Sequence, residues 1–337
     1  MFWRFIFQYI YIYMNSTILY SVLEIIGIVL FSSEGLFVKN IKLHPLINVL
    51  LVYMVYAVVS FIILSVGEQM SMTFIKKLME PKFLITNFAN IIKTGGLFLG
   101  FKLLPVSFAI VIKMMAPAFI IIGNSFLNSD PMNGLQILGI TMSVLLVGLI
   151  YKNPISVAFK NINPSFFLGT MGVIVYNIMN AYNVIKLPQY ITDKNPHEEI
   201  FISTAVAFTT MLIIVTGIFF TNRKLLGSFN HYNIIKMIGV FISTCYIGMS
   251  LTYTADNHLE PMLFSMLQYS QIFIAFGIGY FLEGEKFPLS RIILIILFLL
   301  SIAFTMKVGK KPVKNDKRKI ITNATLFHSE YKKTNKG

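Results

Sequence analysis

The sequence predicts an all-α integral membrane protein with ten transmembrane helices arranged as two inverted five-helix repeats. Hydrophobic residues make up 56% of the 337 residues and charged residues only 12%, and the mean hydropathy is +0.73. One water-soluble core cannot bury that much apolar side chain. Apolar runs long enough to cross a bilayer recur along the chain, and two segments from its two halves align. These observations exclude an ordinary soluble domain.

A bilayer core needs about 20 mostly apolar residues per helix. Turn and polar signals separate the apolar runs, as in the sequences NSDP, DKNPHEE and EGEKFP. The third and fourth runs are divided only by FKLLP. We expect spans at about 18–38, 45–66, 83–101, 104–126, 132–151, 165–186, 199–220, 232–253, 260–282 and 287–306.

An internal repeat divides these spans into two sets. FLNSDPMNGLQILGI, which starts at Phe126, aligns without a gap with FLEGEKFPLSRIILI, which starts at Phe281, and Asp130 then matches Glu285. Because five is an odd number, the second set must enter the membrane in the opposite sense to the first. The predicted repeats are residues 17–155 and 156–306, with a substrate site near the midplane between them.

The two ends of the chain differ from this apolar body. Residues 1–16 form an aromatic segment too short to span, which suits an interfacial anchor. Ten of the 28 Lys and Arg residues follow Met306, so much of the net charge of +14 lies in the tail, residues 307–337. We expect a disordered cytosolic tail beside anionic lipid, both termini in the cytosol, and no nucleic-acid partner.

Lys113 lies near the centre of the fourth predicted span. A lysine at that depth costs on the order of 3 kcal/mol, so it persists where the interior of the protein needs it. Pro117, one turn later, removes an amide donor and loosens the helix. Two interpretations stay open: Lys113 binds or gates an anion, or it forms a structural ion pair with a buried carboxylate such as Glu24.

Other predicted spans carry polar side chains at helical spacing. They serve either as hydrogen bonds between helices or as the lining of a site. Adding the repeat offset of 155 residues to Lys113 gives Gln268, so the two positions are expected to face one axis. The candidate substrate-binding residues are therefore Lys113, Gln268, Gln271, Asn90, Lys93, Tyr176, Asn180 and Glu24. Glu34 and Lys39 are expected at the rim of the first span.

The residue pattern gives little evidence for an enzyme active site or a metal site. The five histidines fall in predicted loops, at span edges or in the tail, and the chain has one cysteine. No histidine pair has ligand spacing with a carboxylate, so we expect no metal, no cofactor and no catalytic residues.

The segment VSFAIVIKMMAP, Val106 to Pro117, resembles the fourth helix of triose-phosphate and related sugar-phosphate translocators in the drug/metabolite transporter superfamily. In that family a lysine at the position of Lys113 helps to hold the substrate phosphate. A Lys-Arg pair on the ninth helix is the second grip, and this sequence has Gln271 and Ile272 there. The rest of residues 17–306, including YSQIFIAFGIGYFLEGEKFP, resembles the EamA-type branch and solute carrier family 35.

The resemblance implies alternating-access transport of a small organic solute, and Lys113 favours an anionic metabolite. The alternatives are a sugar-phosphate antiporter of the triose-phosphate translocator type and a non-transporting receptor or scaffold with the same fold. Expected partners are the metabolite and the lipid bilayer, with a homodimer possible. Golgi or other endomembranes, the plasma membrane and organelle envelopes all remain open.

Overall fold

The computed structural model describes residues 16–66, 80–129, 131–160, 163–190, 196–222, 230–259, 261–284 and 288–308. The predictions for the aromatic N-terminal segment and for nearly all of the basic tail concern residues outside these ranges. So does the match between Asp130 and Glu285.

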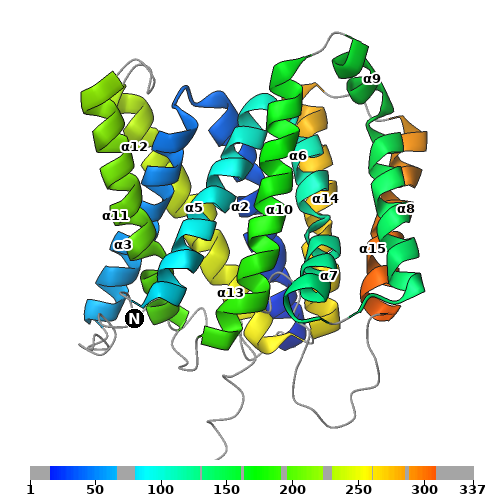
Figure 1. Ribbon diagram of the computed structural model, residues 1–337, viewed down its shortest axis with the longest axis horizontal. Coiled ribbons are helices and arrows are strands. Elements are labelled where there is room, and N and C mark those ends of the chain that lie inside the picture. Colours follow the sequence, from blue (N-terminus) through cyan, green and yellow to red (C-terminus); the bar gives the residue numbers. More distant parts are fainter. Residues whose placement is uncertain are drawn as a thin grey trace, which may run out of the picture.

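Every regular element in the described residues is helical, and the helices stand side by side along one direction (Figure 1). Those from the first predicted repeat are α2 (Ser16–Asn40), α3 (Pro45–Val66), α5 (Pro81–Leu103), α6 (Val106–Lys113), α7 (Ala116–Leu127) and α8 (Gly134–Ile150). The short α9 (Lys152–Lys160) spans the predicted boundary between residues 155 and 156. Those from the second are α10 (Pro164–Tyr190), α11 (Pro196–Asn222), α12 (His231–Val240), the π-helix η2 (Phe241–Ile247), α13 (Gly248–His258), α14 (Pro261–Glu283) and α15 (Leu289–Val308).

Six helical segments of the described chain are long and apolar enough to cross a membrane, and three shorter apolar helices accompany them. Their outer faces expose large apolar side chains, for example Leu145 at 57% on α8 and Leu300 at 60% on α15. A soluble monomer rarely leaves so much apolar surface uncovered, whereas lipid tolerates it. The chain is thus a multi-pass integral membrane protein, and the number of ten spans stays a prediction.

The fourth predicted span is present as the apolar segment Val106–Leu127, but it is not one continuous helix. It divides into α6 and α7 at Met114 and Met115, whose backbones turn with ψ values of −6° and −2°. Pro117 follows in the first turn of α7, where its missing N–H costs nothing. Before α6, Leu104 is extended because it precedes Pro105, and this ends α5.

The eighth predicted span is also irregular. It divides into α12, the π-helix η2 and α13, and single π-helical turns of this kind often occur at functional sites. In the described chain, irregular backbone thus interrupts two of the predicted spans. Lys113 precedes the first interruption and Cys245 belongs to the second, and both are part of the charged group described below.

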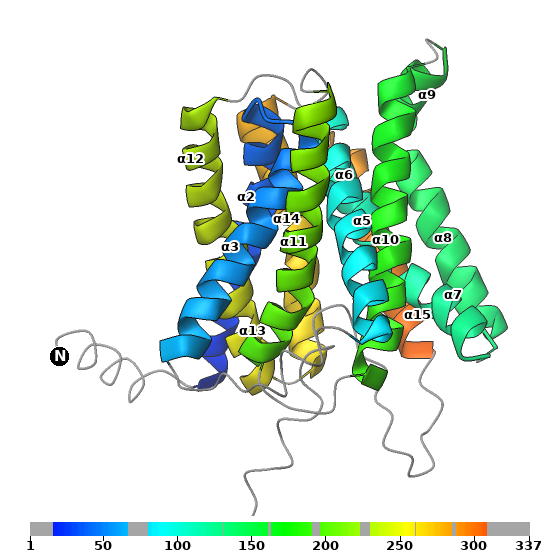
Figure 2. The same ribbon diagram turned by 60° about the vertical axis from the view of Figure 1, so that its left-hand side comes forward.

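Helix pairs from the two halves of the chain pack closely. α3 packs on α11 and α8 on α15, while α5 packs on α10 and α2 on α13. Figures 1 and 2 show α8 and α15 together at one side of the molecule, away from α3 and α12. The central helices α2, α5, α6, α10 and α14 therefore have neighbours on both sides, and they supply most of the buried polar residues.

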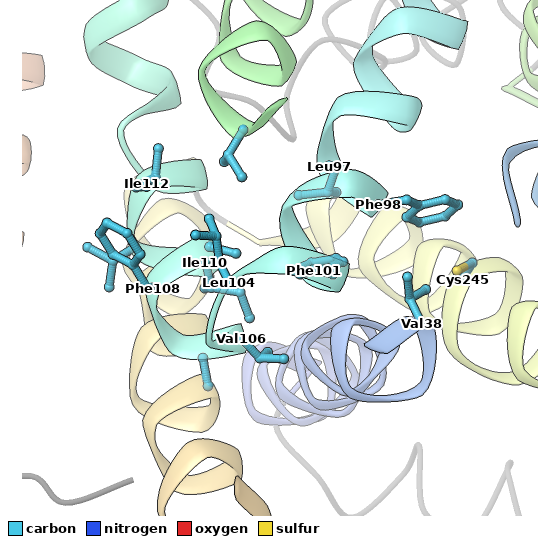
Figure 3. Packing of buried hydrophobic residues seen from close by; sticks show 14 of the residues in the cluster. Val38, Leu97, Phe98, Phe101, Leu104, Val106, Phe108, Ile110, Ile112 and Cys245 are labelled. Carbon is cyan, nitrogen blue, oxygen red and sulfur yellow. The ribbon is translucent and has the colours of Figure 1, made fainter. Parts of the chain in front are cut away.

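The corner between α5 and α6 is a tightly packed apolar region (Figure 3). Phe101, Leu104 and Val106 are each at most 1% exposed. Phe98 stacks on Phe241 of η2, with ring centroids 5.6 Å apart. This packing fixes α5, α6 and η2 against one another, and Lys113 and Cys245 are carried by two of these elements.

Candidate functional site

Lys113 is the last residue of α6 and adjoins the break between α6 and α7. Pro117 cannot donate a backbone hydrogen bond to the Lys113 carbonyl four residues earlier. The preceding carbonyl, that of Ile112, accepts a 2.7 Å hydrogen bond from Asn177 Nδ2 on α10. Asn177 is fully buried. The amide thus stabilises the break from outside the helix and fixes the backbone that carries the lysine.

The charge of Lys113 interacts with that of Glu34 on α2. Glu34 was expected at the rim of its span, and this is wrong: it is 8% exposed and lies among the packed helices. The thiol of Cys245 donates a hydrogen bond of 3.0 Å to Glu34 Oε1. Cys245 belongs to the π-helix η2 and is 1% exposed. A donor from η2 therefore holds the carboxylate in place.

Two further side chains converge on this group. Lys93 lies on α5 about 15 Å from the end of that helix, and its charge interacts with that of Lys113. Tyr176 on α10 is near enough to Glu34 for an electrostatic interaction. We call Lys93, Lys113, Glu34, Cys245 and Tyr176 the charged cluster. Five elements, α2, α5, α6, α10 and η2, contribute one residue each.

The two lysines of the charged cluster are not neutralised by contact. Within the described ranges, neither ammonium has a hydrogen-bond partner or a carboxylate oxygen within 4.0 Å. Both side chains are nevertheless partly exposed, although they lie inside predicted spans. Two like charges held near each other in a medium of low dielectric repel strongly unless an anion or water stands between them. This arrangement suits the binding of an anion.

One predicted site residue, Asn90, joins helices together. Asn183 Nδ2 on α10 donates to Asn90 Oδ1 on α5 at 2.8 Å. The hydroxyl of Tyr53 on α3 donates to the Asn90 carbonyl at 2.7 Å and lies 2.8 Å from Thr94 Oγ1. Asn90 is therefore a link between α3, α5 and α10, and it lies one helical turn from Lys93 on the same helix.

Glu24 and Gln268 form a separate contact. Gln268 Nε2 on α14 donates to Glu24 Oε1, and Glu24 is fully buried. Ten residues of α2 separate Glu24 from Glu34, a rise of about 15 Å. In the described structure Lys113 makes no ion pair with Glu24, so the ion-pair interpretation in that form is wrong. The structure joins Gln268 to α2, and within the described residues no hydrogen bond links it to its predicted repeat partner, Lys113.

The remaining candidates, Asn180 on α10 and Gln271 on α14, are 8% and 4% exposed. Glu34 and Cys245 were not among the site residues predicted from the sequence. One signal was available for Glu34: it shares one side of the helix with Gly27 and Val38, a side more suited to packing than to a rim. A lone cysteine gives no such signal.

A groove and the possible metal ligands were the other candidates for a functional site, and neither is as strong as the charged cluster. A groove of about 380 Å³ between α5 and α11 has no charged side chain in its lining, which comprises Leu84, Ile85, Asn87, Phe88, Val206 and Thr210. Among the residues that the structure describes, no three His, Cys, Asp or Glu side chains form a group that could hold a metal ion. The charged cluster is the stronger candidate for a functional site.

Fold and site together define an α-helical multi-pass membrane protein with charged side chains gathered among its central helices. No family model matches the chain, and no curated protein matches it. A solved structure named "Crystal structure of protein" has a similar fold, with a TM-score of 0.54 at 11% sequence identity. The similarity covers 87% of this chain and 98% of the other. At that identity the likeness concerns the fold alone.

Proposed function

We propose that the protein is a membrane transporter of the drug/metabolite type that moves a small organic anion by alternating access. One observation carries the proposal: Lys93 and Lys113 come from different helices, interact electrostatically, and are both partly exposed with no carboxylate oxygen of the described residues within 4.0 Å. A lysine inside a span is costly. Two lysines gathered in this way are best explained by an anionic ligand that enters from water.

The helix packing supports a two-repeat transporter. If the chain consists of two equivalent halves, α2 and α10 are the first helices of each, and α5 and α12–α13 the third. The first helix of each half then crosses the third helix of the other, and both crossings use glycine. Gly96 faces Gly172 where α5 meets α10, and Gly27 faces Gly248 where α2 meets α13. Like helices also pair, as α3 does with α11 and α8 with α15.

The proposed mechanism requires the charged cluster to be reached from one side of the membrane at a time. The irregular backbone at Met114 and Met115 and the π-helix η2 adjoin the cluster. Such segments can adjust with little loss of hydrogen bonding where a side chain donates to the backbone, as Asn177 does to the Ile112 carbonyl. Rocking of the helix pairs would then alter access to the lysines while the anion stays bound to them.

The test is uptake by purified protein in proteoliposomes, with a panel of radiolabelled organic anions and cations. We expect uptake of anions, and we expect Lys113→Gln to lower it at least tenfold without lowering the melting temperature. Lys236→Gln is the matched control, because the ammonium of Lys236 lies 5.0 Å from the ring centroid of Tyr232 near the start of α12. Full uptake by K113Q would remove Lys113 from the site. Binding without flux would favour a receptor.

A further inference from the structure

We infer that Glu34 is a specificity-determining residue that makes the charged cluster select singly charged over doubly charged anions. This inference rests on the proposed function. The cluster holds two ammonium groups, from Lys93 and Lys113, and one carboxylate, from Glu34. Its formal charge is therefore one positive charge. A monoanion neutralises it, whereas a dianion leaves one negative charge buried.

The carboxylate is fixed in place. Glu34 is 8% exposed, so its side chain has little freedom to leave the cluster. The Cys245 thiol donates to Oε1 at 3.0 Å, and a donated hydrogen bond favours the charged carboxylate. A bound anion that approaches Lys113 therefore meets the negative charge of Glu34 as well. This charge repels the second charge of a dianion more than it opposes the first.

Groups on the other elements packed around Glu34 do not change this charge count. Tyr176 on α10 and Cys245 on η2 are neutral in their ordinary protonation states. The ammonium of Lys102 donates to the carbonyls of Lys39 and Ile41 at the C-terminal end of α2, beyond Glu34. Lys39 and Lys102 are partly exposed at that helix end, where water and salt screen their charges more than those of buried groups. Lys93, Lys113 and Glu34 are left to set the charge of the site.

The charge of the cluster distinguishes this site from that of the sugar-phosphate translocators that the fourth span resembles. A phosphate ester is mostly a dianion at neutral pH, because its second pKa is about 6. Two unopposed cations suit that charge. Here a second lysine is present on α5, yet Glu34 offsets one of the two. The chemistry favours a monovalent substrate such as a carboxylate or a sulfate ester.

The test uses two probes of nearly equal shape, phenyl sulfate as the monoanion and phenyl phosphate as the dianion, at pH 7. Thermal unfolding of the full-length protein in detergent, measured against probe concentration, gives an apparent affinity for each. We expect wild type to prefer phenyl sulfate. Removing one unit charge about 8 Å from the ligand, at an effective dielectric constant of 20, changes the affinity ratio on the order of 30-fold. Glu34→Gln should therefore shift the preference towards phenyl phosphate.

Three further variants sharpen the test. Glu34→Asp retains the charge and should keep the wild-type preference. Glu24→Gln removes a buried carboxylate of the same helix about 15 Å away and should shift the ratio several times less. The double variant E34Q/K113Q restores a single positive charge. It should bind both probes more weakly than wild type, because Lys113 is lost, and should again prefer phenyl sulfate, which keeps the inference testable if E34Q alone does not fold.

The outcomes distinguish the inference from the proposed function. If both probes bind and the affinity ratio is the same in wild type and E34Q, the inference fails while anion binding stands. A preference of E34Q/K113Q for phenyl phosphate would also overturn it. If neither probe stabilises wild type or any variant, the anion site itself fails and the inference fails with it.

Discussion

The crossing of α5 and α10 gives the sharpest test of the packing. A Cβ added at Gly96 would lie 2.3 Å from the carbonyl oxygen of Gly172, whereas one added at Gly95 would meet its nearest neighbour at 3.9 Å. We expect Gly96→Ala to destabilise the protein and the adjacent Gly95→Ala to stabilise it. The two variants make the same chemical change in the same helix, so their difference reports the crossing alone.

The magnitude follows from the contact distance. Cβ atoms essentially never approach another heavy atom closer than 3.0 Å, so the helices must separate by at least 0.7 Å, the difference between 3.0 and 2.3. Overpacking of this kind costs about 3 kcal/mol where the obstacle is backbone, which cannot rotate away. Alanine offsets about 1 kcal/mol through its higher helix propensity. Gly96→Ala should therefore lose about 2 kcal/mol and Gly95→Ala should gain about 1 kcal/mol.

The assay uses the single cysteine of the chain. Cys245 is 1% exposed, so a thiol-reactive dye reports its release on thermal unfolding in detergent. Gly172→Ala is the reciprocal variant, since its Cβ would lie 2.6 Å from the Gly96 carbonyl oxygen. It should melt below wild type as well. A melting temperature for Gly96→Ala equal to or above that of Gly95→Ala would refute the close approach of the two helices.

Two further predictions concern the link beside Lys113 and the loop before α3. Asn177→Leu should lower the unfolding free energy by about 1 kcal/mol, because the Ile112 carbonyl loses its side-chain donor; thermal unfolding measures this, and a gain in stability would contradict the bond. Burial lowers the pKa of His44 from its ordinary value of 6.5, and the Leu46 N–H donates to its neutral Nδ1 at 3.3 Å. The folded state thus favours neutral His44, so its contribution is present above pH 6.5 and is lost as the pH falls below that value. His44→Asn should reduce this acid-side fall in melting temperature, and an equal fall in both proteins would exclude His44 as its source.

The membrane class could be read from composition and from runs of apolar residues because lipid imposes a simple rule of length and hydropathy. The ends of most predicted spans agree with the ends of helical segments to within a few residues; for example, the run expected at about 199–220 is part of α11. Pro117 indicated a weak point in the fourth span, and the helix does break beside it. The π-helix η2 left no such mark, because its geometry depends on how α12 and α13 pack on their neighbours.

The candidate site was less accessible from the sequence. Depth within an apolar run singled out Lys113 and Lys93, since a buried charge is costly wherever it faces. That rule gives no partner. The repeat offset paired Lys113 with Gln268, but in the structure Gln268 donates to Glu24 and Lys113 interacts with Glu34. The crossings of α2 with α6 and α14 decide which side chain each carboxylate meets.

By itself the sequence determined that this chain is a membrane protein and approximately which residues form its helices. It also showed that two lysines lie deep within predicted spans. These properties depend on local hydropathy and on the cost of a charge in lipid, which each segment carries alone. Only the tertiary structure decided that Lys113 lies near Glu34 and Cys245, and that glycine pairs set the central crossings. Contacts between residues more than seventy positions apart depend on the packing of whole helices, and no short stretch of sequence encodes them.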